Sequence, residues 1–160
     1  MTGIRLVCVG RMKEKFFAQA AGEYVKRLSR YADIKIVEVP DSSAPEKLSE
    51  AQKKQVIDAE GQRVLKAAQG RGYIVALDPA GRKLDSLGFA DMLDRASVSG
   101  GSRICFIIGG SMGLSDEVKA AADMLVSFSD MTFPHNLFRI MLLEQIYRGY
   151  KILAGEPYHK

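Results

Sequence analysis

Five short apolar runs divide the chain and predict β-strands. They cover residues Ile4–Val9, Ile34–Val39, Tyr73–Leu77, Arg103–Ile108 and Met124–Phe128. Most of these runs are continuous rather than alternating, which is typical of strands that helices cover on both faces. The pattern therefore predicts a sheet that lies between two layers of helices.

Helical periodicity fills the segments between the runs. Helices are predicted over residues 13–30, 45–68, 86–96, a short stretch after 115, and 136–154. Ser49 and Gln52 have the spacing of a capping box, and Gly155 is placed to end the last helix. Strands that alternate with helices predict a single α/β domain over residues 1–160, with a mainly parallel sheet.

The last predicted helix is apolar nearly all round. Its apolar residues cover far more than one stripe, from Leu137 and Phe138 to Ile152 and Leu153. A helix of this kind is buried on more than one side. In a chain of 160 residues the second side suits a subunit interface, so we expect a homodimer. A central helix in a monomer is the alternative.

Composition and charge narrow the class of protein. With 47% hydrophobic residues the chain can bury a proper core. It has no apolar run of about 18 residues and no signal-peptide pattern, so we expect a cytoplasmic protein without a membrane segment. Residues 1–30 carry seven Lys or Arg and two acids, and residues 135–160 carry four and two. If these basic ends meet on one face, that face suits a polyanion such as RNA. Lysines scattered over helix surfaces are the alternative.

Cysteine and histidine positions give no sign of a metal site. Cys8 and Cys105 each stand inside an apolar run, which predicts buried thiols. There is no CxxC pair, and the two histidines lie far from the cysteines in sequence. We therefore expect no metal.

A glycine-rich segment, 109–113, follows the fourth predicted strand. Ser115 is a suitable N-cap for the helix after it, and Asp116 and Glu117 favour the positive end of that helix. Glycines at such a turn let a ligand approach the backbone closely. The carboxyl end of a strand is also where open α/β sheets bind ligands.

Two ligand chemistries fit this segment poorly. It lacks the Gly-Lys-Ser/Thr of a phosphate-binding loop, and the acids at the helix start would repel phosphate. A serine hydrolase remains an alternative, because GGSMG matches G-x-S-x-G around Ser111, and Asp130 and His135 follow in the required order. Against it, the helix is predicted to start near Ser115 rather than at Ser111, and no HGGG segment precedes it.

A cofactor without phosphates, such as S-adenosylmethionine, is the third possibility. It needs backbone hydrogen bonds and an apolar slot rather than a lysine. An ordinary dinucleotide-binding site has its glycines after the first strand. Here that turn holds only Gly10, and the glycine-rich turn follows the fourth strand. The site is therefore expected in the C-terminal part of the chain.

Several segments, taken in order, carry a resemblance to a known family. They are residues 7–15, 60–61, 77–78, 107–114, 125–135, 143–148 and 157–160. Together they make the chain resemble the RlmH family of the SPOUT superfamily over essentially its whole length. The departures are small: Gly149 stands where alanine is common, and Ser111-Met112 replaces a frequent Pro-Glu.

This resemblance implies a fold and an activity. It implies an α/β fold with a C-terminal trefoil knot and a homodimer with its sites at the interface. It implies methyl transfer from S-adenosylmethionine to N3 of a pseudouridine in large-subunit (23S) ribosomal RNA of the assembled ribosome. The implied cofactor contacts are Leu77, Gly109, Phe128, Ser129, Asp130, Met131, Thr132 and Phe133.

Candidate catalytic side chains come from the basic C-terminal end. His135 and His159 are the two side chains with an ordinary pKa near neutrality. We expect His159, Tyr158 and Arg139 to act jointly, with Tyr158 stacking on a base and Arg139 clamping phosphate or a ring oxyanion. A frayed tail and plain intrahelical pairs, such as Arg148 with Glu144, are the structural alternatives. A non-catalytic RNA-binding module is the remaining alternative for the whole chain.

Overall fold

Five parallel strands form one sheet, in the order β2-β1-β4-β3-β5. The computed structural model describes residues 1–42, 45–70 and 72–160. Along the chain the elements are β1 (Thr2–Val9), α1 (Lys15–Leu28), β2 (Ala32–Val39), α2 (Glu50–Ala68), β3 (Tyr73–Lys83), α3 (Ser86–Ser99), β4 (Arg103–Ile108), α4 (Asp116–Ala121), β5 (Met124–Ser127) and α5 (His135–Leu153). The predicted α/β class with a parallel sheet is confirmed.

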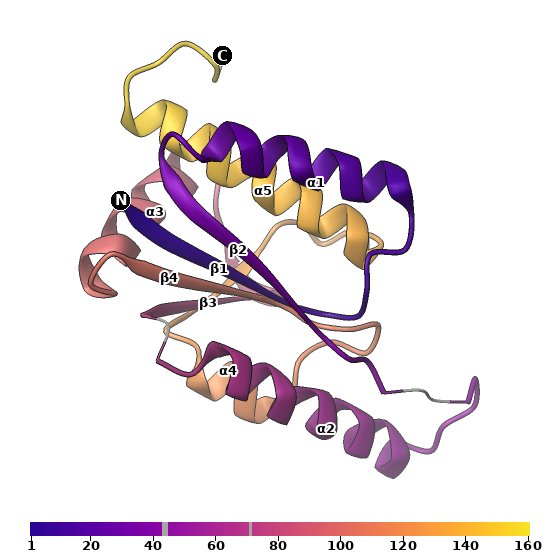
Figure 1. The fold of residues 1–160 in the computed structure, drawn as a ribbon. Coiled ribbons are helices and arrows are strands. Elements are labelled where there is room, and N and C mark those ends of the chain that lie inside the picture. The colour runs from indigo at the N-terminus through magenta and orange to yellow at the C-terminus, as the bar shows by residue number, and fades with distance from the viewer. Residues whose placement is uncertain (43–44, 71) are drawn as a thin grey trace.

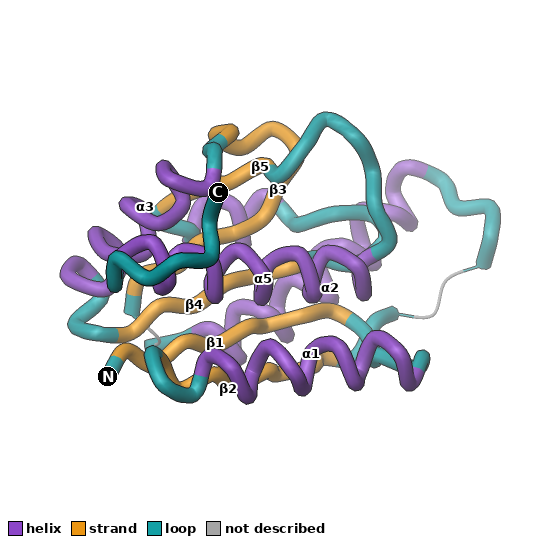
Figure 2. Tube along the Cα trace, turned by 90° about the horizontal axis from the view of Figure 1, so that it is seen from above, coloured by secondary structure: helices purple, strands orange, loops and turns teal. Residues whose placement is uncertain are grey.

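Helices cover both faces of the sheet (Figure 1). Helices α1, α3 and α5 lie on one face, and α2 and α4 lie on the other. Each face has its own core, because β-strand side chains alternate between the two sides. Ile4, Phe106 and Leu142 are buried in the first core, and Val7, Val64 and Ile107 in the second. The view from above shows α1 and α5 side by side over the sheet (Figure 2).

Helix ends follow the local sequence signals. Ser49 caps α2 in the predicted capping box with Gln52. The Ser115 hydroxyl accepts from the backbone N–H of Val118 at the start of α4. Gly155 ends α5 at φ 66°, and its N–H donates to the Ile152 carbonyl at 3.0 Å. This is the glycine-terminated helix end that the sequence predicts.

Strand β3 differs most from its prediction. It continues beyond Leu77 to Lys83, because Arg82 pairs with Val126 of β5 after an irregularity in the register. The two strands run so close at Gly81 that a Cβ there would lie 2.7 Å from the backbone carbonyl carbon of Leu125. The Pro-Ala-Gly segment of β3 looks like a plain turn in the sequence, so only the partner strand reveals the extension.

Two expectations from composition are also addressed by the structure. Cys8 and Cys105 are buried in the neighbouring strands β1 and β4. Burial raises the pKa of the Cys8 thiol to about 11, so it stays protonated. No helix in the described part of the chain is both long and apolar enough to cross a membrane.

Candidate active site

The carboxyl ends of β3, β4 and β5 open into one pocket. All eight residues that the sequence predicts as cofactor contacts line it. The structure therefore brings together three loops that are far apart in sequence. The full lining is Leu77, Asp78, Pro79, Ile108, Gly109, Gly110, Ser111, Gly113, Leu114, Val126, Ser127, Phe128, Ser129, Asp130, Met131, Thr132, Phe133, His135 and Phe138.

The glycine turn after β4 forms one wall of the pocket. The N–H of Gly113 donates to the Gly110 carbonyl at 3.0 Å, and Gly113 has a φ of 86°. At Gly109 a Cβ would lie 2.9 Å from both the Gly113 carbonyl oxygen and Leu114 Cδ2. Only glycine fits there without a shift, so the turn presents bare backbone to the pocket.

Aromatic rings also line the pocket. The rings of Phe133 and Phe138 meet edge to face with centroids 5.5 Å apart, and Phe128 lies 6.1 Å from Phe138. Phe128 and Phe133 come from the loop after β5, whereas Phe138 comes from the first turn of α5. A lining that combines aromatic rings with a bare glycine turn suits a flat, uncharged ring system.

The charged groups at the pocket are acidic, and no Lys or Arg is among the described residues that line it. Asp78 is 8% exposed and forms an ion pair with Lys119 at 3.2 Å. Asp130 is exposed and pairs with Lys83 at 2.5 Å. Such a lining disfavours phosphate groups and suits a ligand that carries positive charge.

His135 stands at the entrance of α5 and lines the same pocket. Burial, and next the positive charge of Arg139, lower the pKa of its imidazole. The ring is therefore neutral near pH 7. In the described part of the chain, no group of three or more His, Cys, Asp or Glu side chains is placed to hold a metal ion.

Arg139 lies inside the protein rather than on its surface. Its side chain is 2% exposed, and Nη1 donates to Glu38 Oε2 at 2.6 Å. Nη2 donates to the Gly10 carbonyl at 2.7 Å. The same Glu38 oxygen accepts from the N–H of Met12 at 2.8 Å. The phosphate clamp expected of Arg139 needs an exposed guanidinium, whereas this one ties the β1–α1 turn to the start of α5.

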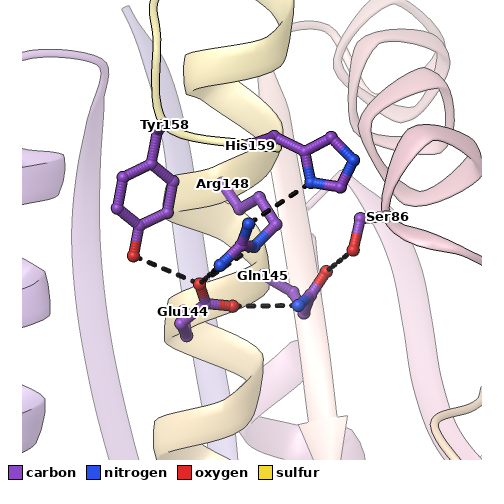
Figure 3. Close-up of polar contacts among 6 residues, drawn as sticks. All are labelled: Ser86, Glu144, Gln145, Arg148, Tyr158 and His159. Atoms are coloured by element: carbon purple, nitrogen blue, oxygen red, sulfur yellow. Dashed lines mark hydrogen bonds and ion pairs between the residues drawn. The ribbon is translucent and has the colours of Figure 1, made fainter.

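The other two predicted catalytic residues lie on the C-terminal tail. The tail folds back along α5, and Tyr158 and His159 meet that helix at Glu144 and Arg148 (Figure 3). Arg148 is ten residues beyond Phe138, the last pocket residue on α5. At 1.5 Å per residue, this is about 15 Å along the helix. Glu144, which Tyr158 contacts, is six residues beyond Phe138, or about 9 Å along the helix, so neither contact of the tail on α5 lines the pocket.

Ser111 lacks the geometry of a hydrolase nucleophile. It is exposed in the turn between Gly110 and Gly113, and α4 begins five residues later, at Asp116. A nucleophile elbow puts its serine on a strained turn directly between strand and helix. Among the described non-glycine residues, only Ser102 has a positive φ. The G-x-S-x-G match is therefore a coincidence of the glycine turn.

Some residues of the site escaped the sequence analysis. Phe138 was interpreted only as part of an apolar helix, and Asp78 only as part of a family match. Their signal is position, since Asp78 ends the apolar run of β3 and Phe138 is one turn from His135. Glu144 appeared only as a pairing partner of Arg148, although it also accepts a hydrogen bond from Tyr158.

The fold and the pocket define an α/β protein with a small-ligand pocket at the carboxyl edge of a parallel sheet. A family model described as "Predicted SPOUT methyltransferase" matches residues 2–159. The chain is also 50% identical to "Ribosomal RNA large subunit methyltransferase H" of Alkaliphilus oremlandii. The match covers 98% of this chain and 99% of that protein. A protein with the same name in Enterococcus faecalis is 48% identical over the same shares.

The chain therefore belongs to the RlmH family of SPOUT methyltransferases. A solved structure described as a probable methylase family protein from Haemophilus influenzae supports the fold alone. It is 11% identical, with a TM-score of 0.58, and the match covers 98% of this chain and 70% of that one.

Proposed function

We propose that this chain transfers a methyl group from S-adenosylmethionine to N3 of a pseudouridine in large-subunit ribosomal RNA of the assembled ribosome, in the cytoplasm. The observation that carries the proposal is the pocket that Leu77, Gly109 and residues 128–133 line together. The names of the relatives support the RNA substrate, and residues 1–160 act as a single catalytic domain in this account.

The pocket residues fit this methyl donor. Adenine can lie between the bare backbone at Gly109 and the rings of Phe128 and Phe133. The carboxylates of Asp78 and Asp130 line the pocket, whereas their lysine partners do not, and carboxylates favour a sulfonium. When bound, S-adenosylmethionine supplies an electrophilic methyl group attached to a positively charged sulfur. The absence of Lys and Arg from the described lining explains why a nucleotide cofactor would bind less well.

The remaining task of the protein is to help N3 lose its proton. N3 of the base loses its proton to an acceptor, and the negative charge spreads to the two neighbouring carbonyl oxygens, which hydrogen-bond donors stabilise. The N3 lone pair then forms the new bond to the methyl carbon as the bond between that carbon and sulfur breaks. We assign this task to His159 and Tyr158 of the tail. Arg139 acts as a positioning residue, because it holds the Gly10–Met12 turn against α5.

We propose further that two copies of the chain complete the site. Reacting atoms must come within about 3–3.5 Å, yet the tail meets α5 at Glu144 and Arg148, about 9 and 15 Å along the helix from Phe138. A second copy can supply the tail that one chain holds too far away. An open, largely apolar groove between α3 and α5 supports a homodimer; it is lined by Tyr24, Leu84, Asp85, Ser86, Phe89, Val126, Phe128, Ile140, Met141, Glu144 and Gln145.

A trefoil knot belongs to the same proposal. The close contact of the β3 extension with β5 at Gly81 supports it. The path of the chain also supports a knot. The chain leaves β5 at one edge of the sheet and continues into α5, and α5 packs beside both α1 and α3 (Figure 2). A knotted crossing of this kind fixes the loop after β5 against the glycine turn, and this keeps the pocket formed before the donor arrives.

Methylation of ribosomes tests the proposed activity. Ribosomes from a strain that lacks the modification are incubated with the protein and radiolabelled S-adenosylmethionine, and the product nucleotide is mapped by mass spectrometry. We expect one labelled N3-methylpseudouridine in the large-subunit RNA. Label in no RNA, with intact binding of S-adenosylmethionine, would contradict the substrate and leave the RNA-binding module as the alternative.

Mixing two inactive variants tests the composite site. His159→Ala removes the tail imidazole, and Gly109→Val fills the glycine turn. Each variant alone is expected to be inactive, whereas a mixture that has exchanged subunits recovers up to about a quarter of the wild-type activity, because half of the dimers are mixed and each has one intact site. No recovery after verified exchange would rule out a site shared by two chains.

A further inference from the structure

Glu144 connects three parts of the molecule through its two carboxylate oxygens (Figure 3). Its Oε1 accepts hydrogen bonds from Arg148 Nε at 3.0 Å, from Arg148 Nη2 at 2.6 Å and from the Tyr158 hydroxyl at 3.2 Å. Its Oε2 accepts from Gln145 Nε2 at 2.9 Å. Gln145 in turn accepts from the Ser86 hydroxyl at 2.8 Å, at the start of α3. One carboxylate thus joins the tail, α5 and the β3–α3 connection.

The surroundings keep this arrangement fixed. The side chains of Glu144 and Arg148 are 19% and 25% exposed, so their ion pair is largely shielded from water. The hydrogen bonds that Arg148 donates to Glu144 raise the pKa of Arg148 further above its ordinary value. The guanidinium lies 4.7 Å from the Tyr158 ring centroid, and the Tyr147 ring meets Tyr158 edge to face at 4.9 Å. Tyr158 is therefore held on two sides.

The contact with His159 decides which ring nitrogen carries the proton. Arg148 Nη1 lies 3.3 Å from His159 Nδ1. A guanidinium has only donors, so Nδ1 must be the acceptor in this contact. A neutral imidazole that accepts at Nδ1 carries its proton on Nε2. The exposed side of the His159 ring therefore presents an N–H group rather than a lone pair.

We propose that Glu144 is a positioning residue that, through Arg148, fixes His159 as an Nε2–H donor to a carbonyl oxygen of the target base. This inference rests on the proposed methyl transfer and refines it. His159 stabilises the negative charge that develops on the ring oxygen, and the N3 proton passes to water. Tyr158, which donates a hydrogen bond to the same carboxylate, lies beside the target base.

Glu144→Gln tests this assignment with little change in size. The amide can no longer attract Arg148 as an anion, so we expect kcat to fall about 10- to 100-fold, the range for losing a charged hydrogen bond. The affinity for S-adenosylmethionine, measured by calorimetry, is expected to stay within about twofold. Asp91→Asn is the matched control, because it breaks a similar i,i+4 pair, with Arg95, on the exposed surface of α3. That control should keep the wild-type kcat.

Nitrogen NMR reports the tautomer of His159, which would not change if Glu144 had a purely structural role. The chain has two histidines, so a His135→Gln variant assigns the His159 signals. We expect the Nε2–H tautomer in the wild type and a mixture of tautomers in Glu144→Gln. An Nδ1–H tautomer in the wild type, or an unchanged kcat in Glu144→Gln, would overturn the proposal. The NMR result needs no RNA, so it stands apart from any failure of the methylation assay.

Discussion

Arg139 and Glu38 form an ion pair of 2.6 Å between residues that are 101 positions apart in the chain. Arg139 is almost fully buried, whereas 37% of the Glu38 side chain is exposed. The pair joins the last helix to the second strand and, through Gly10 and Met12, to the first turn of the fold. It therefore supports the start of α5, where His135 and Phe138 line the pocket.

Removing Glu38 should destabilise the protein. Glu38→Ala leaves the buried guanidinium without its counter-charge, so we expect the free energy of unfolding to fall on the order of 3 kcal/mol. Urea denaturation followed by circular dichroism measures it. Glu23→Ala breaks the exposed pair with Arg27 and should change the stability by less than about 0.5 kcal/mol. Equal losses of unfolding free energy in the two variants would show that the buried pair stabilises the protein no more than the exposed pair does.

The glycine turn should be sensitive to a single methyl group. Gly109→Ala forces the turn away from Gly113 and Leu114, so we expect the dissociation constant for S-adenosylmethionine to rise at least about tenfold. Gly22→Ala is the control, because a Cβ at Gly22 of α1 meets no atom within 4 Å. That change should leave binding intact and stabilise the helix by up to about 1 kcal/mol. Normal binding by Gly109→Ala would place the donor elsewhere.

His135 should make the stability depend on pH below neutrality. Burial and Arg139 lower its folded-state pKa, so above the unfolded value of about 6.5 the ring is neutral in both states. As the pH falls below that value, the unfolded chain binds the proton first and the folded state loses stability. Denaturation midpoints measured from pH 7.5 to 5 should therefore decline, and His135→Gln should flatten the decline. An identical slope in both proteins contradicts this assignment.

Local signals in the sequence predict much of this fold. Apolar runs, most of them continuous, mark all five strands, and Ser49, Ser115 and Gly155 mark helix ends because each satisfies backbone groups of its own helix. The extension of β3 was missed, since pairing of Arg82 with Val126 depends on a strand that comes later in the chain. The strand order likewise depends on contacts between distant segments.

The pocket could be predicted better than the catalytic roles. Loops that follow parallel strands must meet at one edge of the sheet, so the predicted strands agree with the grouping of Leu77, Gly109 and Phe128 that the family resemblance implies. Arg139 could not be placed in this way. An arginine on an apolar helix looks like a surface group until its partner Glu38 is known, and nothing local in the sequence connects the two.

Growth of crystals with S-adenosylmethionine is the most direct test of the pocket. The account predicts electron density for the donor between Gly109 and the loop 128–133, with its sulfonium on the side of Asp78 and Asp130. Density for the donor elsewhere on the protein, with no density in the pocket that these three loops form, would contradict the central claim.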